Sequence, residues 1–168
     1  DCLLSRGLGD VYKRQGWMVA AFEISGIIGM LVAGWATDRF FGGRGPRVCV
    51  ICMALATVFV ALFWGISQPP MWLATLLLGA AGFCIYGPQA LVGIAAANIA
   101  TKKAAATAVG FTGLFGYAST LVSGWGLGLL AQHYGWNIAV GALILIAIMG
   151  TLIFMAAWSA KANGYDND

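Results

Sequence analysis

Two apolar stretches carry the residues with the clearest potential to bind a polar solute, because polar and helix-loosening residues interrupt both near their middles. Tyr86-Gly87-Pro88-Gln89 interrupts the first, and residues 110–117, which read GFTGLFGY, interrupt the second. Gly and Pro loosen backbone hydrogen bonds, which a membrane helix tolerates only where protein or a water-filled cavity takes up the freed groups. The pattern is typical of a solute pathway through a membrane.

An acidic residue, Glu23, lies inside another apolar stretch. A carboxylate inside a bilayer is costly, so such residues usually face a cavity or a basic partner. We interpret Glu23 as part of a substrate-binding or gating network; the alternative is a structural ion pair with another helix. Tyr86 and Tyr117 are candidates for the same network, although a phenol can also pack its ring and find a backbone acceptor.

The composition indicates an integral membrane protein. Hydrophobic residues make up 61% of the chain, charged residues only 9%, and 24 of the 168 residues are glycine. A soluble domain of this size does not need such a composition, whereas closely packed membrane helices do. The net charge of +3 gives no indication of nucleic-acid binding.

Apolar stretches of sufficient length predict an all-α membrane protein with five transmembrane helices. Each can cross a hydrocarbon core of about 30 Å at about 1.5 Å per residue. The expected spans are residues 16–37, 48–66, 71–98, 106–130 and 138–159. Residues 16–160 would then form a transmembrane bundle, with residues 161–168 as a polar tail.

Basic residues predict the orientation, because they favour the cytoplasmic side of a membrane. They follow the first, third and fifth spans, whereas the turns after the second and fourth spans have no Lys or Arg, so we expect the C-terminus in the cytoplasm. The turn from Asp38 to Arg47 is also a candidate gate, in which Asp38 would meet a helix N-terminus or an arginine. We interpret Lys102 and Lys103 as topology anchors. The basic residues concerned are Arg39, Arg44, Arg47, Lys102, Lys103 and Lys161.

Residues 1–15 break this charge pattern. Arg6, Lys13 and Arg14 would lie outside, directly before the first span, and the stretch lacks the regions of a signal peptide. We expect these fifteen residues to be foreign to the native protein or disordered; the alternative is a genuine external segment.

Catalytic and metal-binding patterns are absent from the sequence, so we expect neither an enzyme nor a cofactor or metal site. Cys49 and Cys52 form a C-x-x-C string inside an apolar stretch, but zinc needs four ligands and no second pair exists. We interpret both as small buried residues. His133 is the only histidine, and it lies in an expected external turn at residues 132–137.

An internal similarity predicts that the chain is part of a larger protein. Residues 31–35 read LVAGW and residues 121–125 read LVSGW, in spans that cross the membrane in opposite directions. Inverted repeats of three helices would produce this relation. The chain would then lack one helix of the first triplet.

Several motifs resemble those of a known transporter family. Residues 34–39 (GWATDR) with 43–47 (GRGPR) resemble the loop signature of the major facilitator superfamily between helices eight and nine. Residues 22–26, 86–89, 102–105 and 110–117 are similar to the organophosphate:phosphate antiporters, a group that includes glycerol-3-phosphate and hexose-phosphate transporters and a related sugar-phosphate sensor.

The resemblance implies that the chain carries helices eight to twelve of a twelve-helix protein. Family members hold the phosphate with one arginine on helix one and one on helix seven, so the partners of this chain would be the N-terminal half and helix seven of the same protein, in a lipid bilayer. Tyr86 and Tyr117 match two cavity-facing tyrosines of the glycerol-3-phosphate transporter, and Glu23 matches an acidic residue on helix eight. The hexose-phosphate transporter has a charged pair where this chain has Val109 and Thr112, so the resemblance leaves the organophosphate open.

By this resemblance, we expect an inner-membrane secondary transporter that exchanges a sugar phosphate or glycerol 3-phosphate for inorganic phosphate by alternating access, with the chain alone inactive. The alternative is a membrane sensor of the same fold that binds a sugar phosphate and signals to a partner kinase without transport. A drug or sugar permease of the same superfamily is less favoured, because of the Tyr86 and Tyr117 motifs.

Overall fold

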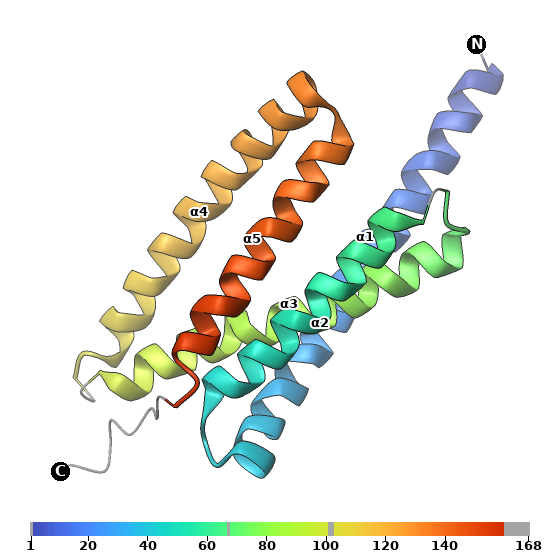
Figure 1. Cartoon of the computed structure of the whole chain (residues 1–168). Coiled ribbons are helices and arrows are strands. Elements are labelled where there is room, and N and C mark those ends of the chain that lie inside the picture. The colour runs from blue at the N-terminus through green and yellow to red at the C-terminus, as the bar shows by residue number, and fades with distance from the viewer. Residues whose placement is uncertain (1, 67, 101–102, 160–168) are drawn as a thin grey trace.

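Five α-helices account for the regular structure of the described residues (Figure 1). The structure is a computed structural model and describes residues 2–66, 68–100 and 103–159. The helices are α1 (Cys2–Phe41), α2 (Gly45–Gly65), α3 (Met71–Ile99), α4 (Ala105–Tyr134) and α5 (Trp136–Ala156).

All five helices are long and apolar enough to cross a membrane. This confirms the predicted all-α class and the five predicted spans, and the chain is a multi-pass membrane protein. Large apolar side chains point outward along the helices; Leu145 of α5, for example, is 64% exposed. In a membrane such side chains meet lipid or other helices instead of water.

The first helix extends further than the sequence predicted. Residues 2–15 continue α1 without a break, so the described part of this segment is helical. The stretch contains leucines and long polar residues and no proline, and such residues are compatible with a helix. Its foreign origin stays a prediction.

The turn between α4 and α5 is shorter than expected. The sequence predicted a turn over residues 132–137, but α4 continues to Tyr134 and α5 begins at Trp136. Only Gly135 separates the two helices, with a φ of 86° that a residue without a Cβ adopts easily. His133 therefore lies in the last turn of α4 and not in a loop.

Glycines allow α1 and α3 to pack closely. A Cβ on Gly29 would collide with the backbone carbonyl of Phe83, and one on Gly82 would lie 2.5 Å from the carbonyl oxygen of Phe22. Ser25 adds a polar contact between the helices, because its Oγ lies 2.7 Å from the carbonyl oxygen of Gly79. Small residues at a helix contact are how membrane helices gain packing energy without a hydrophobic driving force.

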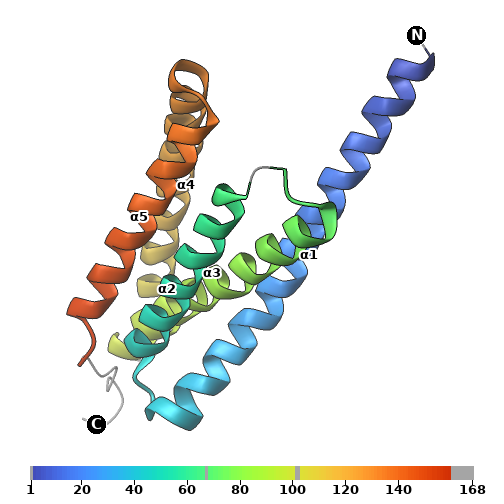
Figure 2. The ribbon, with the colours of Figure 1, turned by 45° about the vertical axis from the view of Figure 1, so that its right-hand side comes forward.

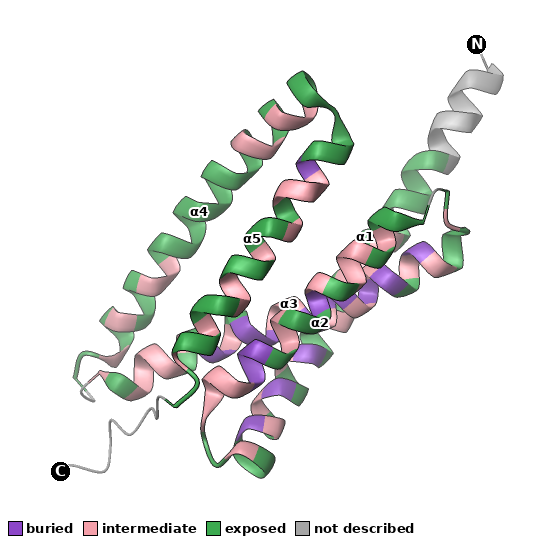
Figure 3. Ribbon diagram, in the orientation of Figure 1, coloured by how far each residue is buried: buried purple, intermediate pink, exposed green. Residues whose placement is uncertain are grey.

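Burial is uneven across the bundle (Figure 3). The core cluster joins Ala33 of α1, Val48 and Cys49 of α2 and Leu91 of α3. In contrast, no residue of α4 is buried, and α5 buries only Ala139. The tightly packed part is therefore formed by α1, α2 and α3, with α5 against α2 and with α4 in contact with α3 and α5.

The glycines of α4 make no close helix contact within the described bundle. A Cβ added at any of them would meet nothing within 4 Å. No described atom lies close to these positions, so the small size of the glycines leaves open space there. The residues concerned are Gly110, Gly113, Gly116, Gly124 and Gly128.

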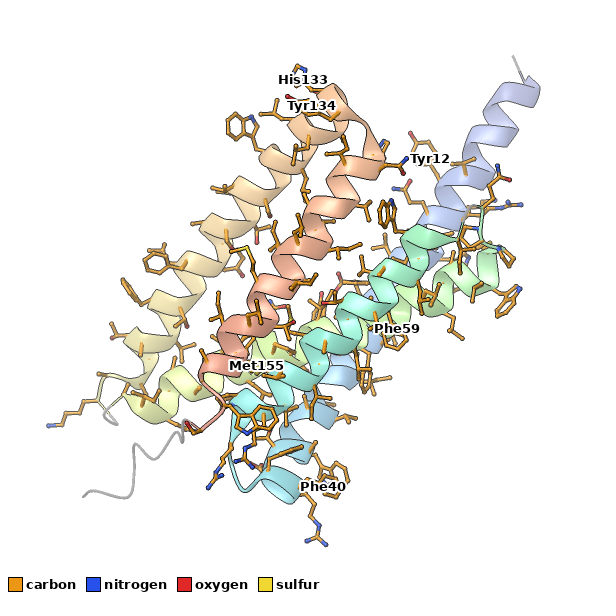
Figure 4. The ribbon with its side chains drawn as sticks, viewed as in Figure 1. Tyr12, Phe40, Phe59, His133, Tyr134 and Met155 are labelled. Atoms are coloured by element: carbon orange, nitrogen blue, oxygen red, sulfur yellow. The ribbon has the colours of Figure 1, made fainter. Side chains whose placement is uncertain are left out.

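The turns alternate between the two ends of the bundle. The α1–α2 and α3–α4 connections and the end of α5 lie at one end, and the other two connections lie at the opposite end (Figures 1 and 2). Figure 4 shows Phe40 and Met155 toward the first end and His133 and Tyr134 at the second. Four basic residues at or beside the helix ends therefore share one end of the bundle: Arg39, Arg44, Arg47 and Lys103.

Candidate functional site

A cavity of about 610 Å³ opens between α3 and α4. Its size lies within the usual range for sites that bind small molecules, roughly 300–1,000 Å³. Met53 of α2 and Phe154 of α5 also line it. The remaining lining residues are Ile85, Pro88, Gln89, Val92 and Gly93 of α3, and Val109, Thr112, Gly113, Gly116, Tyr117, Ser119 and Thr120 of α4.

Residues of the two motifs that interrupt the apolar stretches, at 86–89 and 110–117, help to form this cavity. Gly113 and Gly116 line it and have no side chain to fill it, and no atom lies within 4 Å of where their Cβ atoms would be. Pro88 lies inside α3 without breaking it. Proline has no N–H, so the carbonyl of Cys84 lacks its usual helical hydrogen bond. The motifs at 86–89 and 110–117 thus meet across one space.

The cavity lining is mostly apolar, with five polar side chains and no charged one among the described residues. Gln89, Thr112, Tyr117, Ser119 and Thr120 offer hydrogen-bonding groups, whereas no charged side chain lines the cavity among the described residues. Such a surface can orient a solute through hydrogen bonds. It supplies no fixed charge with which to balance an anion.

Glu23 and Tyr86 form a pair between α1 and α3. The phenol of Tyr86 donates a hydrogen bond to the carboxylate of Glu23. The ring of Phe22 contacts that of Tyr86 edge to face, with 5.9 Å between the centroids. Gly26 leaves room for the Tyr86 ring, which would lie 2.6 Å from a Cβ at that position. Tyr86 is thus held against α1 by a hydrogen bond to Glu23 and by the close fit of its ring over Gly26.

The three predicted substrate residues fall into two places. Tyr117 lines the cavity, whereas Glu23 and Tyr86 lie beside it and are not among its lining residues. Helices α1 and α4 do not contact each other in the part of the chain that the structure describes. Tyr86 precedes Gln89 by three residues, so the two side chains are neighbours on the surface of α3. The pair therefore flanks the cavity.

The predicted gate residues lie at the basic end of the bundle. Asp38 and Arg39 are exposed at the end of α1, and Arg44 and Arg47 are half-buried around the start of α2. The guanidinium of Arg47 lies 5.4 Å from the centroid of the Trp158 ring, just beyond α5. Lys103 is exposed, and Lys102 and Lys161 lie outside the described residues.

Sequence reasoning missed Ser119 and Thr120. A signal was present, because positions 112, 116, 119 and 120 recur at the spacing of one helical face. Ser and Thr are common in membrane helices at close helix contacts. The presence of Ser and Thr in the sequence therefore does not distinguish a cavity wall from a packed helix interface.

The cysteines fit the interpretation as small residues. Cys49 and Cys84 are buried and Cys52 is half-buried, all as free thiols. Within the described ranges, no group of His, Cys, Asp and Glu is arranged to hold a metal ion.

Residues 4–164 match the Major Facilitator Superfamily. The chain belongs to this superfamily. It is 41% identical over 145 residues to a probable hexose phosphate transport protein of Chlamydia muridarum, which covers 85% of the chain and 32% of that protein. It is 34% identical over 170 residues to the glycerol-3-phosphate transporter of Haemophilus influenzae, covering 89% of the chain and 35% of that protein.

A relative with a different role is also similar to the chain. The chain is 35% identical over 146 residues to the membrane sensor protein UhpC of Escherichia coli, with 86% of the chain and 32% of that protein covered. The chain thus spans about a third of the length of these curated relatives. These relatives support the resemblance to organophosphate transporters that the motifs indicated.

Proposed function

We propose that the chain forms part of an inner-membrane antiporter that exchanges a sugar phosphate or glycerol 3-phosphate for inorganic phosphate by alternating access. The observation that carries this proposal is the uncharged cavity between α3 and α4, with its five polar side chains and with the Glu23–Tyr86 pair next to it. It lies in a chain that is similar to transporters of both solute classes. The basic end of the bundle would face the cytoplasm.

The phosphate group of the substrate needs positive charge that this cavity does not supply. Taking a phosphate dianion out of water is prohibitive unless fixed cations compensate for the lost hydration. The described cavity lining contains no Lys or Arg. We therefore expect other helices of the whole protein to bind the phosphate, as the resemblance implies with its two arginines, while the cavity contacts the organic part of the substrate.

The transport hypothesis is tested with the full-length protein in proteoliposomes. Vesicles are loaded with radiolabelled inorganic phosphate, and glucose 6-phosphate or glycerol 3-phosphate is added outside. We expect each ester that is a substrate to release labelled phosphate, and glucose or glycerol to release none. Protein-free vesicles give the background leak. Absence of release with every phosphate ester would contradict the antiporter.

The second candidate is a sensor, which is favoured by the similarity to UhpC. A sensor would bind the sugar phosphate through the same cavity and would pass the signal to a partner kinase. Equilibrium binding to the purified full-length protein separates the two functions. Saturable binding of glucose 6-phosphate without phosphate release from vesicles would identify the sensor.

A further inference from the structure

Two arginines at the start of α2 share one side of that helix with an exposed apolar stripe. Arg47 lies four residues before Ile51 and Arg44 lies seven before it, so both arginines continue the side on which the stripe lies. The stripe consists of four side chains that recur every three or four residues and are between 42% and 52% exposed: Ile51, Leu55, Val58 and Leu62. We call these four residues the apolar stripe of α2.

The apolar stripe is the part of α2 that the described bundle leaves open. The residues that α2 buries are Val48, Cys49, Val50 and Ala56, and none of them belongs to the stripe. In a membrane the stripe would meet apolar groups such as lipid acyl chains. At about 1.5 Å per residue, Val58 lies about 17 Å from Arg47 along the helix axis. This length is close to the hydrocarbon depth of one leaflet, about 15 Å.

The end of α2 that carries the arginines has an excess of positive charge. At this end of the bundle the described residues include four cations, Arg39, Arg44, Arg47 and Lys103, and one acidic residue, Asp38. The first turn of α2 has no acidic residue, and the helix N-terminus adds a partial positive charge. The Nε of Arg47 is buried and has no hydrogen-bond partner among the described residues. A charged group without a partner is costly, so an anion would stabilise this end.

Trp158 orients the guanidinium of Arg47 at the membrane surface. The guanidinium carbon lies 5.4 Å from the centroid of the Trp158 ring. The ring is 42% exposed, and tryptophan is enriched at the membrane–water interface, at the level of the lipid headgroups. A stacked guanidinium keeps a planar set of N–H donors, which can bind two oxygens of one phosphate group.

We propose that Arg44 and Arg47 bind the headgroup phosphate of an anionic phospholipid, and that an acyl chain of this lipid lies along the apolar stripe of α2. The cationic end and the stripe are continuous on one side of the helix, as the two parts of a phospholipid are. A free phosphate would account for the arginines only, and a neighbouring helix for the stripe only. Lipid binding requires no transported solute, so this site goes beyond the proposed function and does not depend on it.

The purified full-length protein in detergent is titrated with dioleoyl phosphatidylglycerol or with dioleoyl phosphatidylcholine, and native mass spectrometry measures the bound lipid. Both lipids have the same acyl chains and a phosphate, but choline cancels the charge of the second. We expect the wild-type protein to bind phosphatidylglycerol at least about fivefold more tightly, the effect of one arginine near an anionic lipid. Excess inorganic phosphate should not displace it, because inorganic phosphate has no acyl chain to bury.

Charge-removing substitutions test which residues bind the headgroup. Arg44→Gln and Arg47→Gln should each lower the affinity for phosphatidylglycerol by about fivefold. Lys103→Gln is the matched control, because it removes one positive charge from the same end of the bundle but lies in the turn before α4. We expect the control to change the affinity by less than about twofold, since its charge is not on the side of α2 that carries the stripe.

A photo-crosslinking side chain tests the position of the acyl chain. Benzoylphenylalanine in place of Leu55, in the full-length protein in nanodiscs of phosphatidylglycerol and phosphatidylcholine, should crosslink to phosphatidylglycerol.

Three results would overturn the inference. The first is equal affinity of the wild-type protein for the two lipids, a measurement that needs no variant. The second is an equal loss of affinity in Lys103→Gln and in the two arginine variants, which would show that only the general surface charge attracts the lipid. The third is crosslinking from position 55 to protein alone, which would show that another helix covers the apolar stripe.

Discussion

At the scale of residues, the Glu23–Tyr86 hydrogen bond fixes a carboxylate beside the cavity. A buried or membrane carboxylate needs a partner, and the phenol of Tyr86 supplies one while the second carboxylate oxygen stays available. The close fit of the Tyr86 ring over Gly26 restricts the ring to this position. The pair can therefore present an ordered acceptor to a substrate hydroxyl or to a cation from another helix.

Replacing Tyr86 or Tyr117 by Phe in the full-length protein should weaken substrate affinity by about 1 kcal/mol, the scale of one hydrogen bond. Expression should be unchanged, because the Tyr86 ring keeps its packing over Gly26 and the Tyr117 ring is largely exposed in the described bundle. The measurement is equilibrium binding of the phosphate ester that proves to be the substrate. Tyr134→Phe, at the tip of α4 in Figure 4, is the control. Unchanged affinity in both variants would show that neither tyrosine hydroxyl contributes to substrate binding.

At the scale of helices, the contact between α1 and α3 depends on backbone approach. Gly29 and Gly82 have no space for a Cβ, because a carbonyl group of the opposite helix occupies it. A side chain there would separate two helices whose residues also form the Glu23–Tyr86 pair. The close helix approach at Gly29 and Gly82 therefore links the stability of the protein to the geometry of the site.

Gly29→Ala should destabilise the full-length protein by about 1–3 kcal/mol, the usual cost of overpacking. The backbone carbonyl of Phe83 would have to move to admit the new methyl group. Thermal unfolding in detergent measures the effect as a lower melting temperature. Gly34→Ala is the matched control, since it lies on the same helix and its Cβ would meet nothing within 4 Å. Equal melting temperatures for the two variants would contradict the close contact.

A second contact between helical segments lies at the basic end of the bundle. Arg47 of α2 lies over the ring of Trp158, next to the end of α5. Cation–π pairs contribute roughly 0.5–1 kcal/mol at exposed sites. A double-mutant cycle with Arg47→Met and Trp158→Leu, read from thermal unfolding of the full-length protein, should give a coupling energy of that size. Additive effects of the two substitutions would show that the contact contributes nothing.

The sequence predicted the five helices because length and apolarity are local properties. It did not predict that α4 continues to Tyr134, since Gln132 and His133 are compatible with both a turn and a helix. It also did not show which glycines pack closely against another helix. Gly29 and Gly82 are packed while Gly113 and Gly116 line a cavity, and which face meets another helix depends on tertiary packing. For the same reason it found Tyr117 but missed Ser119 and Thr120.

At the scale of the whole molecule, α4 presents a large apolar surface. Leu121 and Trp125 are 77% and 73% exposed, and no α4 residue is buried. The relatives are about three times as long as the aligned part of this chain. We expect further helices of the whole protein to lie against α4 and to close the cavity, since alternating access requires two halves around a central site.

The chain of 168 residues alone should therefore neither bind nor transport an organophosphate. Its described cavity offers neutral hydrogen-bonding groups only, and a phosphate dianion without a cationic partner loses more hydration energy than those groups return. Binding of radiolabelled glycerol 3-phosphate to the purified chain, compared with the full-length protein, measures this directly. We expect saturable binding only with the full-length protein. Saturable binding to the chain alone would mean that its own residues bind the phosphate, and would contradict the assignment of that role to other helices.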